Sequence, residues 1–241
     1  MSDDMSIAVG TSDEVDRVQR SLSSSPAWCS YQGVTCDSVS TSATYESVTS
    51  IDLGGLSLTG TIPSSLGSLT SLQSLSFGTN NLAGTLPSSI GSCTSLTALY
   101  LDTNSLIGTI PSSIGSCTLL EFLKLYSNIL IGTIPSSIGS LTKLTSLGLQ
   151  SNKLTGTIPS TFSKLITAYY LDLDTNYLTM GSATTVPTST FSSATLSNTL
   201  VLTTNCLAFS YGSNTVYVTH CAPTSGKSVI LYESVLSRQV S

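Results

Sequence analysis

The chain has 241 residues, of which only 9% are charged, with a formal net charge of −5 and a pI of about 4.5. This balance leaves no basic surface for a phosphate backbone, so nucleic acid is excluded as an expected partner. No run approaches about 18 consecutive apolar residues, so no membrane span is expected in this chain.

Residues 1–47 precede the regular part of the sequence. Thr11 and Glu14 have the spacing of a capping box, which marks the start of a helix. Val15, Val18 and Leu22 would share one face of a short helix after it. We expect this helix to cover the open end of the core that follows. Residues 1–10 are acidic and lack the basic and apolar regions of a secretory signal.

Residues 48–207 are built from a repeat of 24 residues, and GTIPSSIGS occurs at residues 108–116 and again at residues 132–140. The repeat is marked by regularly spaced prolines: Pro63, Pro87, Pro111, Pro135 and Pro159. Five units are regular, and two degenerate units begin near Ala168 and Ser197. Between Leu178 and Val186 there are about four extra residues, so the sixth coil should bulge. A period in this range predicts a solenoid of stacked coils.

Each position of the unit has a physical role. Leucines in the pattern LxxLxL have the spacing of a short strand with one side in a core, which only stacked neighbours can bury. An asparagine follows each strand, and we expect its amide to bond the turns above and below. The stretches GTIP and SSIGS predict a second extended piece and a helical or 3₁₀ turn. The asparagine ladder is Asn80, Asn104, Asn128, Asn152, Asn176 and Asn205, and Leu56 replaces it in the first unit.

The unit resembles the plant-type leucine-rich repeat, LxxLxxLxLxxNxLxGxIPxxLGxLxx. The resemblance implies an α/β solenoid, a right-handed superhelix with a parallel sheet on its concave face and short 3₁₀ or helical turns on its convex side. WCSYQGVTCD at residues 28–37 looks like the N-terminal cap of the family, with Tyr31 where the family has Trp. Residues 208–221 resemble a C-terminal cap, and residues 222–241 are expected to be a tail. The resemblance therefore implies cysteine-containing caps at both ends.

The six cysteines fall into two kinds. Cys93 and Cys117 occupy positions that Leu69 and Leu141 hold in other units, so we expect buried thiols that act as small apolar side chains. A metal site is the alternative for the other four, but the single histidine argues against a Cys/His cluster, and no metal or cofactor is expected. Bridged caps would imply an oxidising, extracellular or cell-surface location. Local spacing predicts the cap disulfides Cys29 with Cys36 and Cys206 with Cys221.

Function should come from the outward positions of the strands, because the repeat pattern only builds the scaffold. These positions hold small residues in the first two units, and aromatic and charged residues in the third, fourth and sixth. Adjacent strands lie about 4.8 Å apart, so the aromatic residues of units three and four would touch, and those of unit six would lie roughly 10 Å away across a shallow gap. Aromatic anchors ringed by polar groups are typical of interfaces, although strands also favour aromatic residues in general. The predicted concave ligand-binding surface is Tyr100, Asp102, Phe122, Lys124, Tyr126, Gln150, Tyr169, Tyr170, Asp172 and Asp174.

The resemblance to receptor-like kinase ectodomains and polygalacturonase-inhibiting proteins implies a non-catalytic recognition module for a protein, peptide or glycan, in cell-surface signalling or defence. A secreted inhibitor of a polysaccharide-degrading enzyme is one alternative. The chain is expected to be a monomer when free, and it fits a fragment of a membrane receptor. Ice binding is another alternative, because serine pairs and threonines repeat once per unit. The threonines are Thr61, Thr85, Thr109, Thr133 and Thr157.

An enzyme is the interpretation that the residues support least. The only histidine, His220, lies beside a cap cysteine, so a Ser-His-Asp arrangement has no base near the predicted face. Asp172 and Asp174 alternate on one strand and form a carboxylate pair of the kind that glycosidases use. We expect them instead to be solvated charges beside Tyr170.

Overall fold

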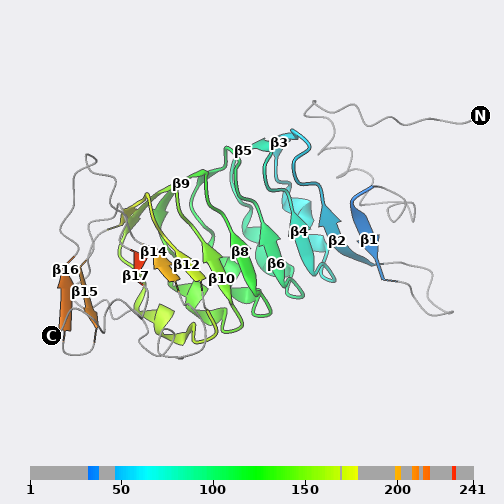
Figure 1. Ribbon diagram of the computed structural model, residues 1–241. Coiled ribbons are helices and arrows are strands. Elements are labelled where there is room, and N and C mark those ends of the chain that lie inside the picture. Colours follow the sequence, from blue (N-terminus) through cyan, green and yellow to red (C-terminus); the bar gives the residue numbers. More distant parts are fainter. Residues whose placement is uncertain are drawn as a thin grey trace, which may run out of the picture.

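The computed structural model describes residues 32–37, 47–168 and 170–178, together with the backbone of four later strands. It is a solenoid whose coils are stacked side by side, as Figure 1 shows. Several predictions fall outside the described residues: the helix over residues 15–22, and those for Cys29, Tyr169, Asn205, Cys206 and Cys221.

One nine-stranded sheet forms the inner, concave face of the solenoid (Figure 1). Each regular coil contributes one strand, which pairs in parallel with the equivalent residues of the next coil, for example Leu99 with Leu123 and Leu123 with Leu147. The predicted parallel sheet is therefore confirmed for the repeats. The strands, in sheet order, are β1 Val34–Cys36, β2 Val48–Asp52, β4 Ser74–Ser76, β6 Ala98–Tyr100, β8 Phe122–Lys124, β10 Ser146–Gly148, β12 Tyr170–Asp172, β14 Thr199–Val201 and β17 Ile230–Leu231.

The two edges of this sheet differ from its centre, because both edge strands are antiparallel. Strand β1 pairs with β2, and β17 pairs with β14. Strand β17 lies within residues 222–241, which the sequence analysis expected to be a tail. Thr199 of β14 pairs with Tyr170 of β12, a spacing of 29 residues instead of 24, so the sixth coil is five residues longer than a regular one. This is close to the expected four extra residues, whose predicted place between Leu178 and Val186 lies outside the described residues. Strands β15 Ala208–Tyr211 and β16 Asn214–Tyr217 form a hairpin.

A second set of parallel strands follows the inner strands in each coil. Its register advances by 22 residues per coil, as in Ile107 beside Ile129. Gly108 shows why a glycine is needed here, since its φ is +77° and a Cβ would lie 2.9 Å from Cγ2 of Thr85 in the preceding coil. The strands are β3 Thr59–Thr61, β5 Asn81–Ala83, β7 Ile107–Gly108, β9 Ile129–Thr133, β11 Lys153–Gly156 and β13 Tyr177–Leu178.

Short 3₁₀ helices complete the coils at the SSIGS stretches, as predicted. Each begins after a proline and has no side-chain cap at its start. The second serine instead links coils, as when Ser113 Oγ donates to the carbonyl of Ser88 at 2.6 Å. The helices are η2 Ser64–Ser68, η3 Ser88–Ser92, η4 Ser112–Ser116, η5 Ser136–Ser140 and η6 Ser160–Lys164.

The core is a continuous stack of leucine and isoleucine side chains between these three layers. Cys93 and Cys117 are buried in it as free thiols, as expected from the leucines at equivalent positions. Burial raises the pKa of both thiols, that of Cys117 to about 11. Cys36 is disulfide-bonded, but its predicted partner Cys29 lies outside the described residues, so that pairing stays a prediction.

The asparagine ladder is present, but each side-chain amide bonds only to its own coil and to the preceding coil. Asn128 Nδ2 donates to the carbonyls of Leu101, Leu125 and Tyr126, and its Oδ1 accepts from Leu106 N at 2.9 Å. These groups belong to its own coil and the preceding coil, and the other described ladder residues repeat the pattern. The expectation that each amide bonds turns on both sides was therefore wrong. Leu56 is tolerated in the first coil because no regular coil precedes it.

Candidate binding site

The register of the inner sheet gathers most of the predicted contact residues on one face. Tyr100, Lys124 and Asp172 lie in one row across strands β6, β8 and β12, with Gly148 between the last two. Phe122 and Tyr170 lie in the neighbouring row, separated by Ser146. Asp102, Tyr126, Gln150 and Asp174 follow the ends of their strands at equivalent positions of successive coils.

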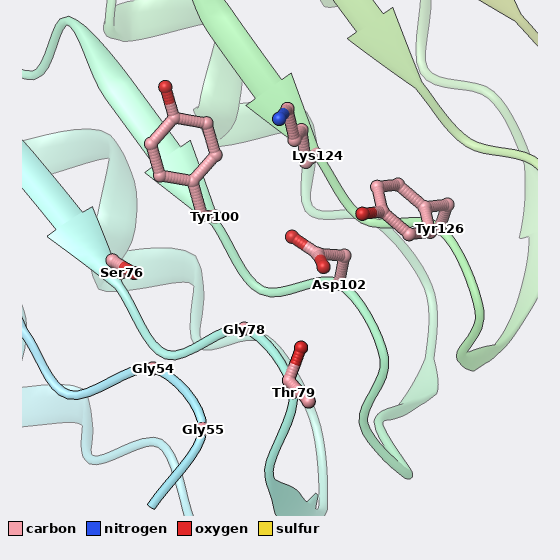
Figure 2. A pocket seen from close by; sticks show the side chains of 9 residues that line it. All are labelled: Gly54, Gly55, Ser76, Gly78, Thr79, Tyr100, Asp102, Lys124 and Tyr126. Carbon is pink, nitrogen blue, oxygen red and sulfur yellow. The ribbon is translucent and has the colours of Figure 1, made fainter.

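A hollow of about 390 Å³ lies on this face over the first four coils. In Figure 2 the glycines of the first two coils lie on one side of the hollow, and the side chains of coils three and four lie on the other. The small residues of the first two coils are thus part of the site. Its lining residues are Gly54, Gly55, Ser76, Gly78, Thr79, Tyr100, Asp102, Lys124 and Tyr126.

One wall of the hollow is an aromatic and cationic cluster. The rings of Tyr100 and Phe122 are tilted against each other with their centroids 6.4 Å apart, so the predicted contact between coils three and four is confirmed. Lys124 Nζ lies 4.9 Å from the centroid of the Tyr100 ring, a cation–π distance. The side chain of Lys124 therefore has a defined place above the ring (Figure 2).

The base of the hollow holds the carboxylate of Asp102, which is only 9% exposed. It lies against the backbone of the neighbouring coil, since a Cβ on Gly78 would be 3.0 Å from Asp102 Oδ1. The Tyr126 hydroxyl faces this carboxylate in Figure 2. Burial, together with the interaction of the hydroxyl with the Asp102 carboxylate, raises the pKa of Tyr126.

Coil five does not leave the open gap that its small residues suggested. A Cβ on Gly148 would lie 3.1 Å from Cδ1 of Tyr126 and 3.1 Å from Oε1 of Gln150. The side chains of coils four and five therefore lie over Gly148, and the expectation of a shallow gap at this place was wrong. Gln150 Oε1 is buried here without a hydrogen-bond partner in the described part of the chain.

Coil six presents a second polar cluster beside Tyr126. The Tyr170 hydroxyl donates to Asp172 Oδ2 at 2.9 Å, and the Asp174 amide donates to Asp172 Oδ1 at 3.1 Å. Burial, the bond to Asp172 and the charge of that carboxylate raise the pKa of Tyr170 to about 12. Burial also raises the pKa of Asp172, although its two hydrogen bonds oppose the change. Asp172 is 8% exposed, so it is not the solvated charge that the strand pattern suggested.

The predicted surface therefore consists of two connected parts. Tyr100, Lys124, Tyr126 and Asp102 form the wall and base of the hollow, and Phe122 contacts Tyr100 without lining the hollow. Gln150, Tyr170, Asp172 and Asp174 form the cluster over coils five and six. Tyr169 lies outside the described residues. The sequence analysis missed the floor of the hollow: Gly54, Gly55, Ser76, Gly78 and Thr79. The sequence contained one signal for this floor. The outward positions of the first two units hold small residues, next to the aromatic residues of units three and four.

No group of at least three His, Cys, Asp or Glu residues in the described ranges is placed to hold a metal ion. A search of the same residues for a helix with the length and hydropathy of a membrane span found none.

A family model for the leucine-rich repeat matches residues 47–69, 71–93, 95–117, 119–141 and 143–165. No curated protein sequence gives a significant match. The leucine-rich repeat ectodomain of the receptor kinase SOBIR1 from Arabidopsis thaliana is 30% identical, with a TM-score of 0.60, and the match covers 70% of this chain and 96% of that one.

Two further solved structures are similar to this chain. One is the Arabidopsis receptor kinase HAESA, in complex with the peptide hormone IDA and the co-receptor SERK1. It is 34% identical, with a TM-score of 0.58, and the match covers 74% of this chain and 29% of that one. The other is a plant ice-binding protein, 30% identical with a TM-score of 0.52, where the match covers 62% of this chain and 55% of that one.

Proposed function

Since this chain belongs to the leucine-rich repeat family, we propose that it is a non-catalytic recognition module that binds a protein, peptide or glycan on its concave face. The observation that supports this most is the column of aromatic and charged side chains held in register on the inner sheet. Tyr100, Lys124 and Tyr126 border a hollow, and the leucines beneath them fix their strands. Such a polar and aromatic surface on a rigid scaffold is suited to binding.

We place this module outside the cell, in cell-surface signalling or defence. The similarity to ectodomains of receptor kinases supports this location. The disulfide at Cys36 also fits an oxidising compartment. Inhibition of a polysaccharide-degrading enzyme is a specific form of the same proposal, in which the partner is a protein.

The proposal is tested with panels of immobilised oligosaccharides and a displayed peptide library, probed with the full chain. We expect a binder whose affinity falls at least about tenfold when Tyr100 and Lys124 are both changed to Ala. Tyr177→Ala is the matched control, because Tyr177 is 65% exposed on the second set of strands. Equal binding by the concave-face variant and the control would show that recognition does not use the inner sheet.

Ice binding is a second candidate, favoured by the exposed column Thr61, Thr85, Thr109, Thr133 and Thr157. The similarity to a plant ice-binding protein supports it. Packing also explains these threonines, because their methyl groups lie against glycines of the next coil, as Thr109 lies against Gly132. Thermal hysteresis by the pure protein that is lost in Thr109→Lys would establish the candidate, and no hysteresis in the wild-type protein would end it.

A further inference from the structure

We propose that the hollow over the first four coils binds one neutral sugar unit of a glycan. This inference rests on the proposed function and specifies its ligand class.

The floor of the hollow leaves space beside the backbone of the first coil. Gly54 and Gly55 are exposed, and a Cβ built on Gly55 would meet no atom within 4 Å, whereas Gly78 is buried against the Asp102 carboxylate. The volume of about 390 Å³ lies near the lower end of the range for small-molecule sites, about 300 to 1,000 Å³. One sugar ring with part of its neighbour fits this space better than a long side chain or a helix.

The wall supplies aromatic surface to the hollow. Tyr100 and Tyr126 both line the hollow, and the cation of Lys124 already lies over the ring of Tyr100. An aromatic body with a polar end can contact the C–H face of a sugar and leave its hydroxyls to polar groups. This combination favours a ligand that is apolar on one face and polar at its rim.

The charges of the hollow favour a neutral ligand rich in hydroxyl groups. Asp102 and Lys124 give one negative and one positive charge, so the lining has no net charge that would attract an anionic or a cationic ligand. A hydroxyl group can both donate to Asp102 and accept from Lys124. Ser76 and Thr79 add hydroxyls that also act in both ways.

Strand pairing argues against a peptide that extends the sheet. Strands β4, β6 and β8 below the hollow are each paired on both sides, so they offer no free edge for an added strand. A peptide therefore cannot bind here by backbone ladder pairing, and Gly54 and Gly55 supply few contacts for its side chains. A sugar ring, in contrast, uses the floor itself.

The experiment compares two tyrosine substitutions on strand β4. Ser76 lines the hollow, whereas Ser74 points to the same side of the sheet two residues earlier and is not among the lining residues. Ser76→Tyr should fill the hollow, and Ser74→Tyr adds the same side chain beside it. Both positions lie in a strand, where tyrosine is well accepted.

The probes are neutral gluco-, manno-, xylo- and galacto-oligosaccharides, an oligogalacturonide as the anion and a chitosan oligosaccharide as the cation. We expect at least one neutral probe to bind with a dissociation constant of about 1 mM or tighter. Ser76→Tyr should weaken this binding at least about tenfold, and Ser74→Tyr should leave it within about twofold. Lys124→Gln gives an independent readout and should weaken binding of the same probe without a change in melting temperature.

The inference is overturned if no neutral probe binds, if a charged probe binds more tightly, or if both tyrosine variants bind equally. The outcome for the proposed function is separate. Peptides that bind the wild-type chain and are lost on the Tyr100 and Lys124 double substitution would preserve the recognition function and reject the sugar. Binding of no saccharide and no peptide to the concave face would reject both.

Discussion

Tyr126 lies over Gly148 of the next coil, where a Cβ would come within 3.1 Å of Cδ1 of the tyrosine ring. The hydroxyl of the same tyrosine faces the carboxylate of Asp102 in the preceding coil (Figure 2). One side chain thus connects the hollow to the cluster around Tyr170, and the two parts of the candidate surface form one continuous face across coils three to six.

This relationship predicts the effect of Gly148→Ala. The new methyl group would displace the Tyr126 ring, which would weaken the interaction of its hydroxyl with Asp102 and lower the pKa of that hydroxyl towards the ordinary value of 10.0. The measurement is an NMR titration of the Tyr126 ring, assigned with Tyr126→Phe. An unchanged titration in Gly148→Ala would show that the ring does not depend on the space above the glycine.

Alkaline titration should single out Tyr170. Its pKa is raised from 10.0 to about 12, so the folded protein keeps a proton that the unfolded chain loses. The stabilising contribution is therefore fully present below pH 10 and is lost as the pH rises towards 12. We expect the latest step of tyrosinate absorbance to disappear in Tyr170→Phe. If Tyr170→Phe instead removes a step at lower pH, burial and the bond to Asp172 do not raise the pKa of Tyr170 above those of the other tyrosines.

The one-sided ladder predicts a contrast between two positions. Asn128→Ala removes four hydrogen bonds and leaves buried backbone groups without partners, which should lower the free energy of unfolding by roughly 3 kcal/mol or more. Leu56→Asn should change it by less than about 1 kcal/mol, because no regular coil precedes the first one. Chemical denaturation measures both, and a large gain from Leu56→Asn would contradict the direction of the ladder.

Backbone strain recurs at the residue before each ladder asparagine that the structure describes. Thr103 has a φ of +54°, which a β-branched residue rarely adopts. Asparagine tolerates this region, so Thr103→Asn should raise the free energy of unfolding by roughly 0.5–1 kcal/mol. Thr118→Asn, at an exposed position without a positive φ, is the matched control and should not stabilise. Equal effects of the two substitutions would mean that strain is not the cause.

The sequence predicts much of this fold because each coil repeats the same physical constraints. The leucines at 99, 123 and 147 have strand spacing and are fully buried, and the prolines start the 3₁₀ helices as expected. The antiparallel pairing of β17 with β14 could not be predicted, because residues 222–241 carry no repeat pattern that relates them to the sheet. The direction of the asparagine bonds also depends on how the coils are stacked, which spacing alone does not define.

The candidate site was predicted only in part, for a related reason. Tyr100 and Lys124 can be recognised in the sequence as large side chains at outward positions. The parallel strand register then places them side by side. A glycine has no side chain that indicates a site. Gly54 and Gly78 can therefore be assigned to the hollow only when the positions of the neighbouring wall residues are known. The burial of Asp102 and Asp172 likewise arises from neighbours in other coils, which a strand pattern does not show.

The most direct test of recognition on the concave face is a map of backbone amide chemical shifts during titration with the oligosaccharide or peptide selected by the panels. The account predicts that the largest changes cluster at residues 54–55, 76–79, 100–102 and 124–126, which surround the hollow. Largest changes at the second set of strands instead, around Ile107, Ile131 and Thr155, would contradict it.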